Sequence, residues 1–137
     1  MSKSNTTEND FVKMVFLGDD PAWRAAGATL YLSLHTADPG EGGTQTSSEC
    51  TYTPYARVGV SKDASGWTVS GAQAVNTADV IWPECTSGAE TITHVGIGTA
   101  PSGAGQLLYS GALTGSRAVS AGIQPRIAAT ILQITED

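Results

Sequence analysis

Residue types that hydrolases use lie close together in residues 30–60. Ser33, His35 and Asp38 are the types of a nucleophile, a general base and an orienting carboxylate. On an extended strand Ser33 and His35 point the same way, roughly 6–7 Å apart, and their alternation with leucines is that of a solvated strand face. No G-x-S-x-G turn presents the serine as a nucleophile. The pattern therefore predicts no catalytic residue and no enzyme.

A metal site would need His35 and His94 to converge with carboxylates such as Asp38, Glu41 and Glu49. The sequence has no H-x-x-x-H or H-E-x-x-H spacing, and its acidic residues lack the spacing of an EF-hand loop. The glycine-rich stretches "DPGEGG" and "GIGTAPSGAG" lack the strand-to-helix context of a phosphate or dinucleotide site. We therefore predict no metal and no cofactor, and expect both histidines to be hydrogen-bonded to backbone or to face a subunit contact.

The elements that hold these residues are predicted to be strands. From Ala28 onward apolar residues alternate with a period of two, in about eight segments separated by Gly, Asn and Pro. In the first segment one face carries Leu30, Leu32 and Leu34, and the other Tyr31, Ser33 and His35. The last segment, "RIAATILQIT", is apolar on both faces and predicts a central strand. The expected fold is all-β, an antiparallel β-sandwich or a jelly-roll-like barrel.

A short helix is predicted ahead of the strands. Thr7 and Asp10 have the spacing of a capping box, and Gly18 is suited to the helix end. An apolar stripe follows at Phe11, Met14 and Val15. A helix this short is marginal alone, so the stripe must dock on its own domain or on a neighbouring subunit. We predict an N-terminal arm at residues 1–27, whose polar start should be mobile unless something holds it, and a β-sandwich domain at residues 28–137.

Composition and charge exclude several kinds of partner. The 137 residues suggest one domain, and a net charge of −6 with seven scattered basic residues argues against nucleic acid and anionic membranes. No run of 18 apolar residues predicts a transmembrane helix, and the first residues lack the apolar core of a secretory signal. The spacing of Cys50 and Cys85 favours neither a metal site nor a redox motif; two free thiols or a disulfide remain open.

The segment from Asp38 to Pro54 is long for a hairpin loop and rich in Thr, Ser and Gln. A loop of this length in a small sandwich is usually functional or mobile. Because its residues lack catalytic geometry, contact with another molecule is the function that we assign to it.

A family resemblance rests on the same residues. The segment "LYLSLHTADPGEGGTQTSSECTYTPYARVGVSKDASGW", the segment "TITHVGIGTAPSGAGQLLYSGAL" and the ending "LQITED" resemble a small family of tailed-bacteriophage virion proteins. Its members often carry the label tail fibre protein. The resemblance covers about residues 11–137, and it implies a structural protein of the virus particle.

Two virion roles remain open at this point. A fibre must be long or repetitive, whereas a capsid decoration (cement) protein is a compact domain whose arm bridges shell subunits. The arm and the weakly charged surface favour a head decoration protein, assembled in the host cytoplasm and placed on the capsid surface. Its expected partners are the major capsid protein and itself, as a homodimer or homotrimer. A tail-associated or tail fibre protein that contacts the host surface is the alternative.

The residues expected to make these contacts come from the helix and the long loop. They are Phe11, Met14, Val15, Trp23, Asp38, Glu41, Thr44, Gln45 and Tyr52.

Overall fold

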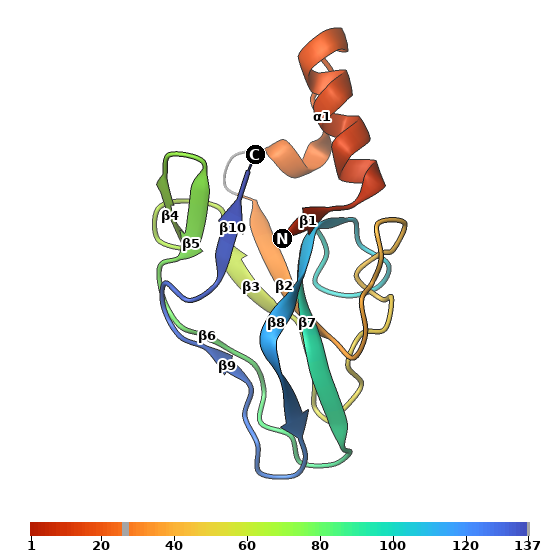
Figure 1. The fold of residues 1–137 in the computed structure, drawn as a ribbon, viewed down its shortest axis with the longest axis vertical. Helices are drawn as coiled ribbons and strands as arrows, with labels where there is room; N and C mark the ends of the chain where they lie inside the picture. Colours follow the sequence, from red (N-terminus) through yellow and green to blue (C-terminus); the bar gives the residue numbers. More distant parts are fainter. Residues whose placement is uncertain (26–27, 137) are drawn as a thin grey trace.

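The computed structural model describes residues 1–25 and 28–136, which form an all-β fold with one N-terminal helix (Figure 1). The larger sheet is antiparallel, with strand order β1-β8-β7-β2-β3. Its strands are β1 Ser2–Lys3, β8 Leu107–Val119, β7 Glu90–Gly98, β2 Thr29–His35 and β3 Val58–Ser61. The segments "GQLLYSGAL" and "SRAVSAG", which alternation would divide into two strands, form the single 13-residue strand β8.

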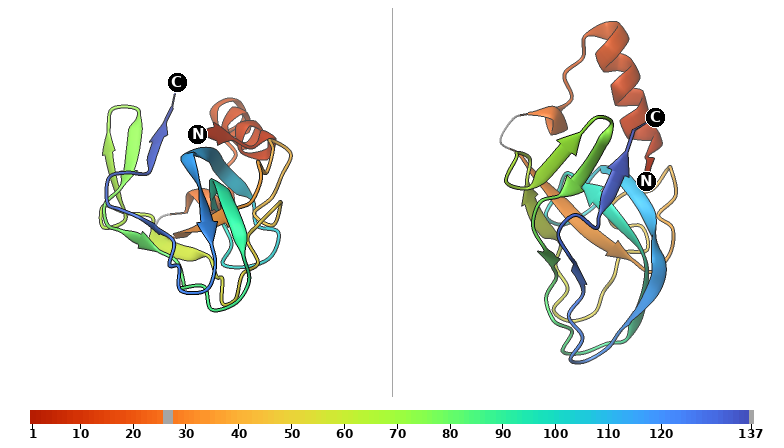
Figure 2. Two further views of the ribbon diagram at one scale, coloured as in Figure 1. Left: turned by 60° about the horizontal axis from the view of Figure 1, so that its bottom comes forward. Right: turned by 60° about the vertical axis from the view of Figure 1, so that its left-hand side comes forward.

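Two small antiparallel sheets form the opposing layer. One is ordered β10-β5-β4 and the other pairs β6 with β9, and Figure 2 shows them beside the larger sheet. The bounds are β4 Trp67–Ser70, β5 Gln73–Asn76, β6 Val80–Ile81, β9 Arg126–Ile127 and β10 Gln133–Thr135. The predicted all-β antiparallel sandwich is confirmed.

The hydrophobic core lies between these layers. Leu32 and Leu34 of β2 pack with Trp82, Leu132 and Ile134, and the Trp82 indole donates to the Leu32 carbonyl at 3.3 Å. The inward direction predicted for these two leucines is confirmed.

Strand β7 departs from simple alternation. Strict alternation would place Ile92 on the face opposite to Val95 and Ile97, but all three are in the core. A register shift between Ile92 and His94 explains this, because an extra residue at a β-bulge resets which side chains face inward.

Helix α1 runs from Asn5 to Leu17 and begins earlier than predicted. Its N-cap is Ser4, whose hydroxyl accepts from the Thr7 N–H, so the capping box predicted at Thr7 is wrong. Gly18 ends the helix in the left-handed region at φ 70°, as expected, because glycine has no Cβ to penalise that conformation. A short 3₁₀ turn, η1, follows at Ala22–Arg24, inside the predicted arm. Residues 26 and 27 of that arm lie outside the described part of the chain.

The start of the chain is a strand of the larger sheet, so the sheet holds the polar segment that would be mobile if unattached. Strand β1 pairs with β8 at Ser110 and Tyr109, and the Lys3 ammonium lies 2.6 Å from a Glu136 oxygen. The Ser4 and Thr7 hydroxyls both donate to the Leu107 carbonyl. These bonds hold the base of α1 against the sheet. The predicted division of the chain into an arm at residues 1–27 and a domain at residues 28–137 stays a prediction.

The single central strand predicted for "RIAATILQIT" is wrong. The segment instead forms β9 and β10, separated by Thr130 at φ 65°. Buried Asn76 holds the break open: its amide donates to the Ala128 carbonyl and its oxygen accepts from the Leu132 N–H. A side chain that bonds the backbone in this way replaces the ladder that a continuous strand would need.

Candidate functional site

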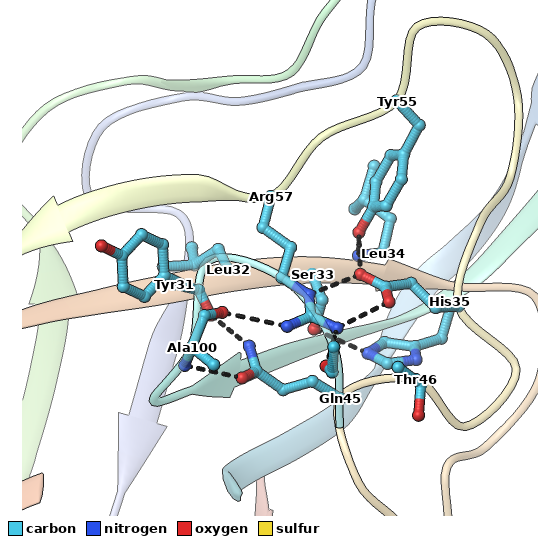
Figure 3. Close-up of polar contacts among 12 residues, drawn as sticks. Tyr31, Leu32, Ser33, Leu34, His35, Gln45, Thr46, Tyr55, Arg57 and Ala100 are labelled. Carbon is cyan, nitrogen blue, oxygen red and sulfur yellow. Dashed lines mark hydrogen bonds and ion pairs between the residues drawn. The ribbon is translucent and has the colours of Figure 1, made fainter. Parts of the chain in front are cut away.

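Ser33 and His35 are buried, not solvent-facing as the alternation suggested. Both are 0% exposed, and Ser33 Oγ lies 2.8 Å from His35 Nε2 (Figure 3). His35 Nδ1 lies 2.8 Å from the Ser47 carbonyl, which can only accept. In neutral His35 the proton is therefore on Nδ1, and Ser33 donates to Nε2. The residues of the long loop cover this strand face, which a period-two pattern cannot reveal.

This serine–histidine pair has the atoms of a nucleophile and a base but no access for a substrate. Gly96 pairs with Ser33 on the neighbouring strand β7, and a Cβ added there would lie 2.7 Å from His35 Nε2 and 2.8 Å from Ser33 Oγ, so the pair is packed tightly against that strand. Asp38 lies outside it and accepts from the Gly40 N–H. Burial is the main cause that lowers the pKa of His35, and the hydrogen bond to the Ser47 carbonyl opposes this shift. The contacts define a structural lock between β2 and the loop.

A buried ion pair fastens the other end of the loop. Arg57 Nε and Nη2 donate to the two oxygens of Glu49, both at 2.7 Å. The Arg57 side chain is only 2% exposed. Arg57 also donates to the carbonyls of Ala100 and Gly103, and the Tyr55 hydroxyl donates to Glu49. Because all these partners are fixed, the guanidinium is not available to bind an acidic ligand.

Gln45 and Tyr52, predicted to contact a partner, are buried in their own domain. Gln45 donates to the Tyr31 carbonyl at 3.1 Å and accepts from the Ala100 N–H at 3.0 Å (Figure 3). The Tyr52 hydroxyl donates to the Pro83 carbonyl. Both side chains lack surface for another molecule, so their assignment as contact residues is corrected: they hold the loop in place.

The remaining predicted contact residues of the loop lie in its outer turn. Asp38 and Glu41 are exposed and Thr44 is half-buried. Asp38, Glu41 and His94 line a cavity of about 440 Å³ together with Lys3. Within residues 1–25 and 28–136, no three His, Cys, Asp or Glu side chains group closely enough to hold a metal ion. This cavity can offer polar contacts, and the absence of a metal site stays a prediction.

Both cysteines are buried free thiols in the structure. Burial, with the nearby Glu90 and Glu49 carboxylates, raises the pKa of Cys50 to about 12. A thiol in this state is a poor nucleophile, because the thiolate is the reactive form.

The predicted contact residues of the helix divide between two sides of α1. The Phe11 and Trp23 rings pack at 5.5 Å between centroids, and Trp23 Nε1 donates to Asp10 at 2.8 Å. These two aromatic residues therefore contact each other. Met14 is half-buried, whereas Val15 is 68% exposed.

The helix α1 has a second apolar face, which the sequence pattern at Phe11, Met14 and Val15 did not predict. Val12 and Phe16 are 56% and 79% exposed, and Leu17 is exposed as well. With Val15, the pair Val12 and Phe16 has the i, i+3, i+4 spacing of one helix face. The signal was present in the sequence as a second stripe beside the one at Phe11. The last turns of α1 are therefore apolar on both sides, and one side has no cover within the described chain.

These features define an all-β domain whose polar residues tie down its own loop and whose helix presents a bare apolar face. No helix in the described part of the chain is long and apolar enough to cross a membrane. A family model described as Podophage GP4 fiber I protein gp80 matches residues 2–135. The chain belongs to this family, and it is a structural protein of the phage virion. No curated protein matches the chain.

Proposed function

We propose that the protein is a non-enzymatic component of the podophage tail-fibre assembly, which works by attachment to other virion proteins. The observation that carries the attachment role is the bare apolar end of α1. Contiguous exposed apolar surface of this kind marks an interaction site, so the outer face of the last turns needs a partner. The family's description as a fiber protein supports the tail position.

The buried state of the chemical groups supports a role without catalysis. The candidate nucleophile and base, Ser33 and His35, are fully buried and packed against Gly96 of the neighbouring strand. The ionic pair of Glu49 and Arg57 is engaged by its own domain. Substrate conversion would require the loop to open against these bonds, whereas attachment uses surface that is already exposed.

A second candidate is the head decoration protein, bound to the major capsid protein. The observation in its favour is a compact domain from which α1 projects (Figure 1), a shape suited to bridging two shell subunits. In either position many weak contacts of the same kind give firm attachment through multivalency.

Location in the purified particle distinguishes the two positions. Quantitative mass spectrometry and labelling of the protein in electron micrographs should find a few to a few dozen copies, confined to the tail. Hundreds of copies spread over the head would replace the tail position with the decoration role. A protein missing from mature particles would overturn both.

The exposed acidic turn offers a test of which surface touches the virion. We expect Glu41→Lys to reduce incorporation into particles, because it reverses a charge on the outer turn of the loop. Glu84→Lys is the matched control, since Glu84 is also exposed but lies outside that turn. Equal incorporation of both variants would remove the turn from the contact surface.

A further inference from the structure

A groove lies at the end of the molecule opposite to α1. It opens between the last part of β8 and the β6–β9 pair with the turns that flank it (Figure 1). Its volume is about 450 Å³, which is within the roughly 300–1,000 Å³ of sites that enclose a ligand. Its apolar wall includes Leu113, Ile123 and Ile131, and the last two are 45% and 67% exposed. We call this cavity the β8–β9 groove.

The strand in the wall of this groove bulges away from its neighbour in the larger sheet. Ala112 of β8 lies opposite His94 of β7, but Arg117 lies opposite Ile92. Residues 113–116 therefore have no register partner on β7. Their backbone lies directly at the groove, since most of this segment belongs to its lining.

The other edge of β8 is also free beyond Ser110. Strand β1 pairs with β8 only at Tyr109 and Ser110. Among the residues that the structure describes, no further strand pairs with that edge. No backbone hydrogen bond outside the sheets reaches residues 111–119 in the same part of the chain. Unpaired N–H and C=O groups of this kind are a template for an extended segment of another chain.

Two arginines make the rim of the groove positive. Arg117 and Arg126 belong to its lining, which contains no Asp or Glu of the described residues. Arg126 lies 3.3 Å from an Asp79 oxygen, and its side chain is still 57% exposed. Arg117 forms no ion pair within the described chain. Because the whole chain carries a net charge of −6, this local excess of cations favours an acidic partner.

Three carboxylates lie on the segments beside the groove, and they leave Arg117 free. Asp79 neutralises part of the Arg126 charge. Glu90 begins β7 and accepts hydrogen bonds from the Thr51 N–H, so it is engaged by the long loop. Glu84 is exposed on the segment between β6 and β7 and forms no ion pair in the described part of the chain.

We propose that an extended acidic segment of another protein adds a strand to β8 and fills the β8–β9 groove. Its backbone pairs with residues 113–116, and every second side chain packs on the apolar wall, because side chains of a strand alternate between two faces. An acidic side chain of the segment pairs with Arg117. A glycan is less suited to this site, since it has no regular row of amide groups to pair with a strand.

This surface is separate from the bare face of α1, which lies at the opposite end of the molecule (Figure 1). One chain can therefore hold two partners at the same time. The contact does not depend on whether the virion position is tail or head.

Selection of binders for the full chain from a random peptide library tests the proposal. We expect the enriched peptides to alternate apolar with other side chains and to contain Asp or Glu. Their binding should shift the backbone amide signals of residues 111–119 in NMR spectra. A library that yields no binding peptide, or peptides that shift signals only elsewhere in the chain, overturns the proposal.

Charge reversal at Arg117 tests the acidic contact. Arg117→Glu should weaken binding of the selected peptides roughly tenfold or more in fluorescence anisotropy, and Arg117→Gln should weaken it less, because it removes the charge without reversing it. Arg24→Glu is the matched control: Arg24 is also exposed but lies in η1, outside the groove, so binding should be unaltered. Circular dichroism checks that all three variants are folded. Equal binding by Arg117→Glu and Arg24→Glu contradicts the proposal.

Backbone methylation of a selected peptide tests the strand pairing itself. In an extended peptide, N-methyl groups on alternate residues block the N–H groups of one edge only. Methylation of one alternate set should abolish binding, and methylation of the other set should leave it nearly unchanged. Retained binding by both methylated peptides would show that the groove holds side chains without a backbone ladder.

An acidic polysaccharide separates a protein partner from a sugar partner. We expect alginate neither to bind through Arg117 nor to displace a selected peptide at physiological ionic strength. Alginate that binds the wild type as tightly as the peptides, and that loses this binding in Arg117→Glu, would make the groove a glycan site and overturn the proposal.

Discussion

The long loop and the end of α1 present opposite combinations of residue type and environment. Residues 36–57 lie beside Ser33 and His35 and include Glu49 and Arg57, yet these side chains bond one another or nearby backbone. The end of α1 has side chains with little chemistry, such as Val12 and Phe16, and they stand in solvent. The polar groups of the loop have hydrogen-bond partners, whereas the apolar side chains at the end of α1 have no packing partners in the described part of the chain.

This difference shows that unsatisfied surface is a better guide to function than residue type. A buried polar group must be hydrogen-bonded, so a chemically rich cluster can serve folding alone. An exposed apolar helix face makes no contacts that stabilise its own domain, so folding does not explain it. Variants can break or sharpen the contrast by measuring how far each region contributes to the free energy of unfolding.

The largest loss of stability is expected from Glu49→Ala. This change leaves the Arg57 guanidinium buried without its carboxylate, and removal of one partner of a buried pair costs about 3–5 kcal/mol. Urea unfolding followed by circular dichroism measures the change. The control is Arg24→Ala, which breaks the exposed pair with Asp20 and should cost about 1 kcal/mol or less. Similar losses for both variants would mean that the loop is not locked by this pair.

The next largest effect is expected from Gly96→Ala. The added methyl group would overlap His35 Nε2 and Ser33 Oγ, and forcing atoms into a packed interior costs about 1–3 kcal/mol. Thermal unfolding measures the loss. Gly115→Ala on the neighbouring strand is the control, because its nearest atom is the flexible end of Arg117 at 3.4 Å. An unchanged melting temperature for Gly96→Ala would indicate that the Ser33–His35 lock is loose enough to admit other groups.

A smaller effect should come from protonation of His35. Burial lowers its pKa in the folded state from the ordinary 6.5, so the unfolded chain binds the proton more readily. The stability contributed by neutral His35 is complete above pH 6.5 and falls as the pH drops through the window between 6.5 and the lowered folded pKa.

Unfolding free energies measured across that window test this sign. The carboxylates whose pKa values are lowered in the folded state, including Asp10 and Glu136, titrate at lower pH than His35. They therefore change the stability below the pH window in which His35 does. His35→Gln should remove the slope between neutral pH and pH 5, if it folds. A wild-type stability that rises as the pH falls through this range would contradict the buried, neutral histidine.

The smallest effect on stability is expected from Phe16→Glu. The side chain is 79% exposed, so the free energy of unfolding should change by no more than about 0.5 kcal/mol. The measurement belongs at low protein concentration, where self-association does not stabilise the folded chain by mass action. A loss comparable to that of Glu49→Ala would show that α1 belongs to the core and would remove the contrast between the two regions.

Local sequence patterns predicted the positions of strands and helix ends better than they predicted which faces of these elements are buried. The alternation in "LYLSLH" predicted β2 and the inward leucines, and Gly18 predicted the end of α1. The same alternation placed His35 in solvent, because periodicity separates two faces but does not tell which faces are covered. "RIAATILQIT" failed for a similar reason: Asn76, more than fifty residues away in sequence, replaces the strand ladder there.

The site shows the same division. Phe11 and Val15 were correctly seen as apolar helix positions, but the stripe did not reveal which side Trp23 would cover. Gln45 and Tyr52 looked like surface residues of a polar loop, and long-range bonds to Ala100 and Pro83 buried them.

The sequence by itself determined the all-β class, the short leading helix and the family, since these depend on periodicity, turn residues and motifs within short segments. The tertiary structure alone decided that Ser33, His35 and Arg57 are sealed while Val12 and Phe16 are bare. The physical reason is that burial is set by contacts between distant segments, and a local pattern records which residues could be covered without recording what covers them.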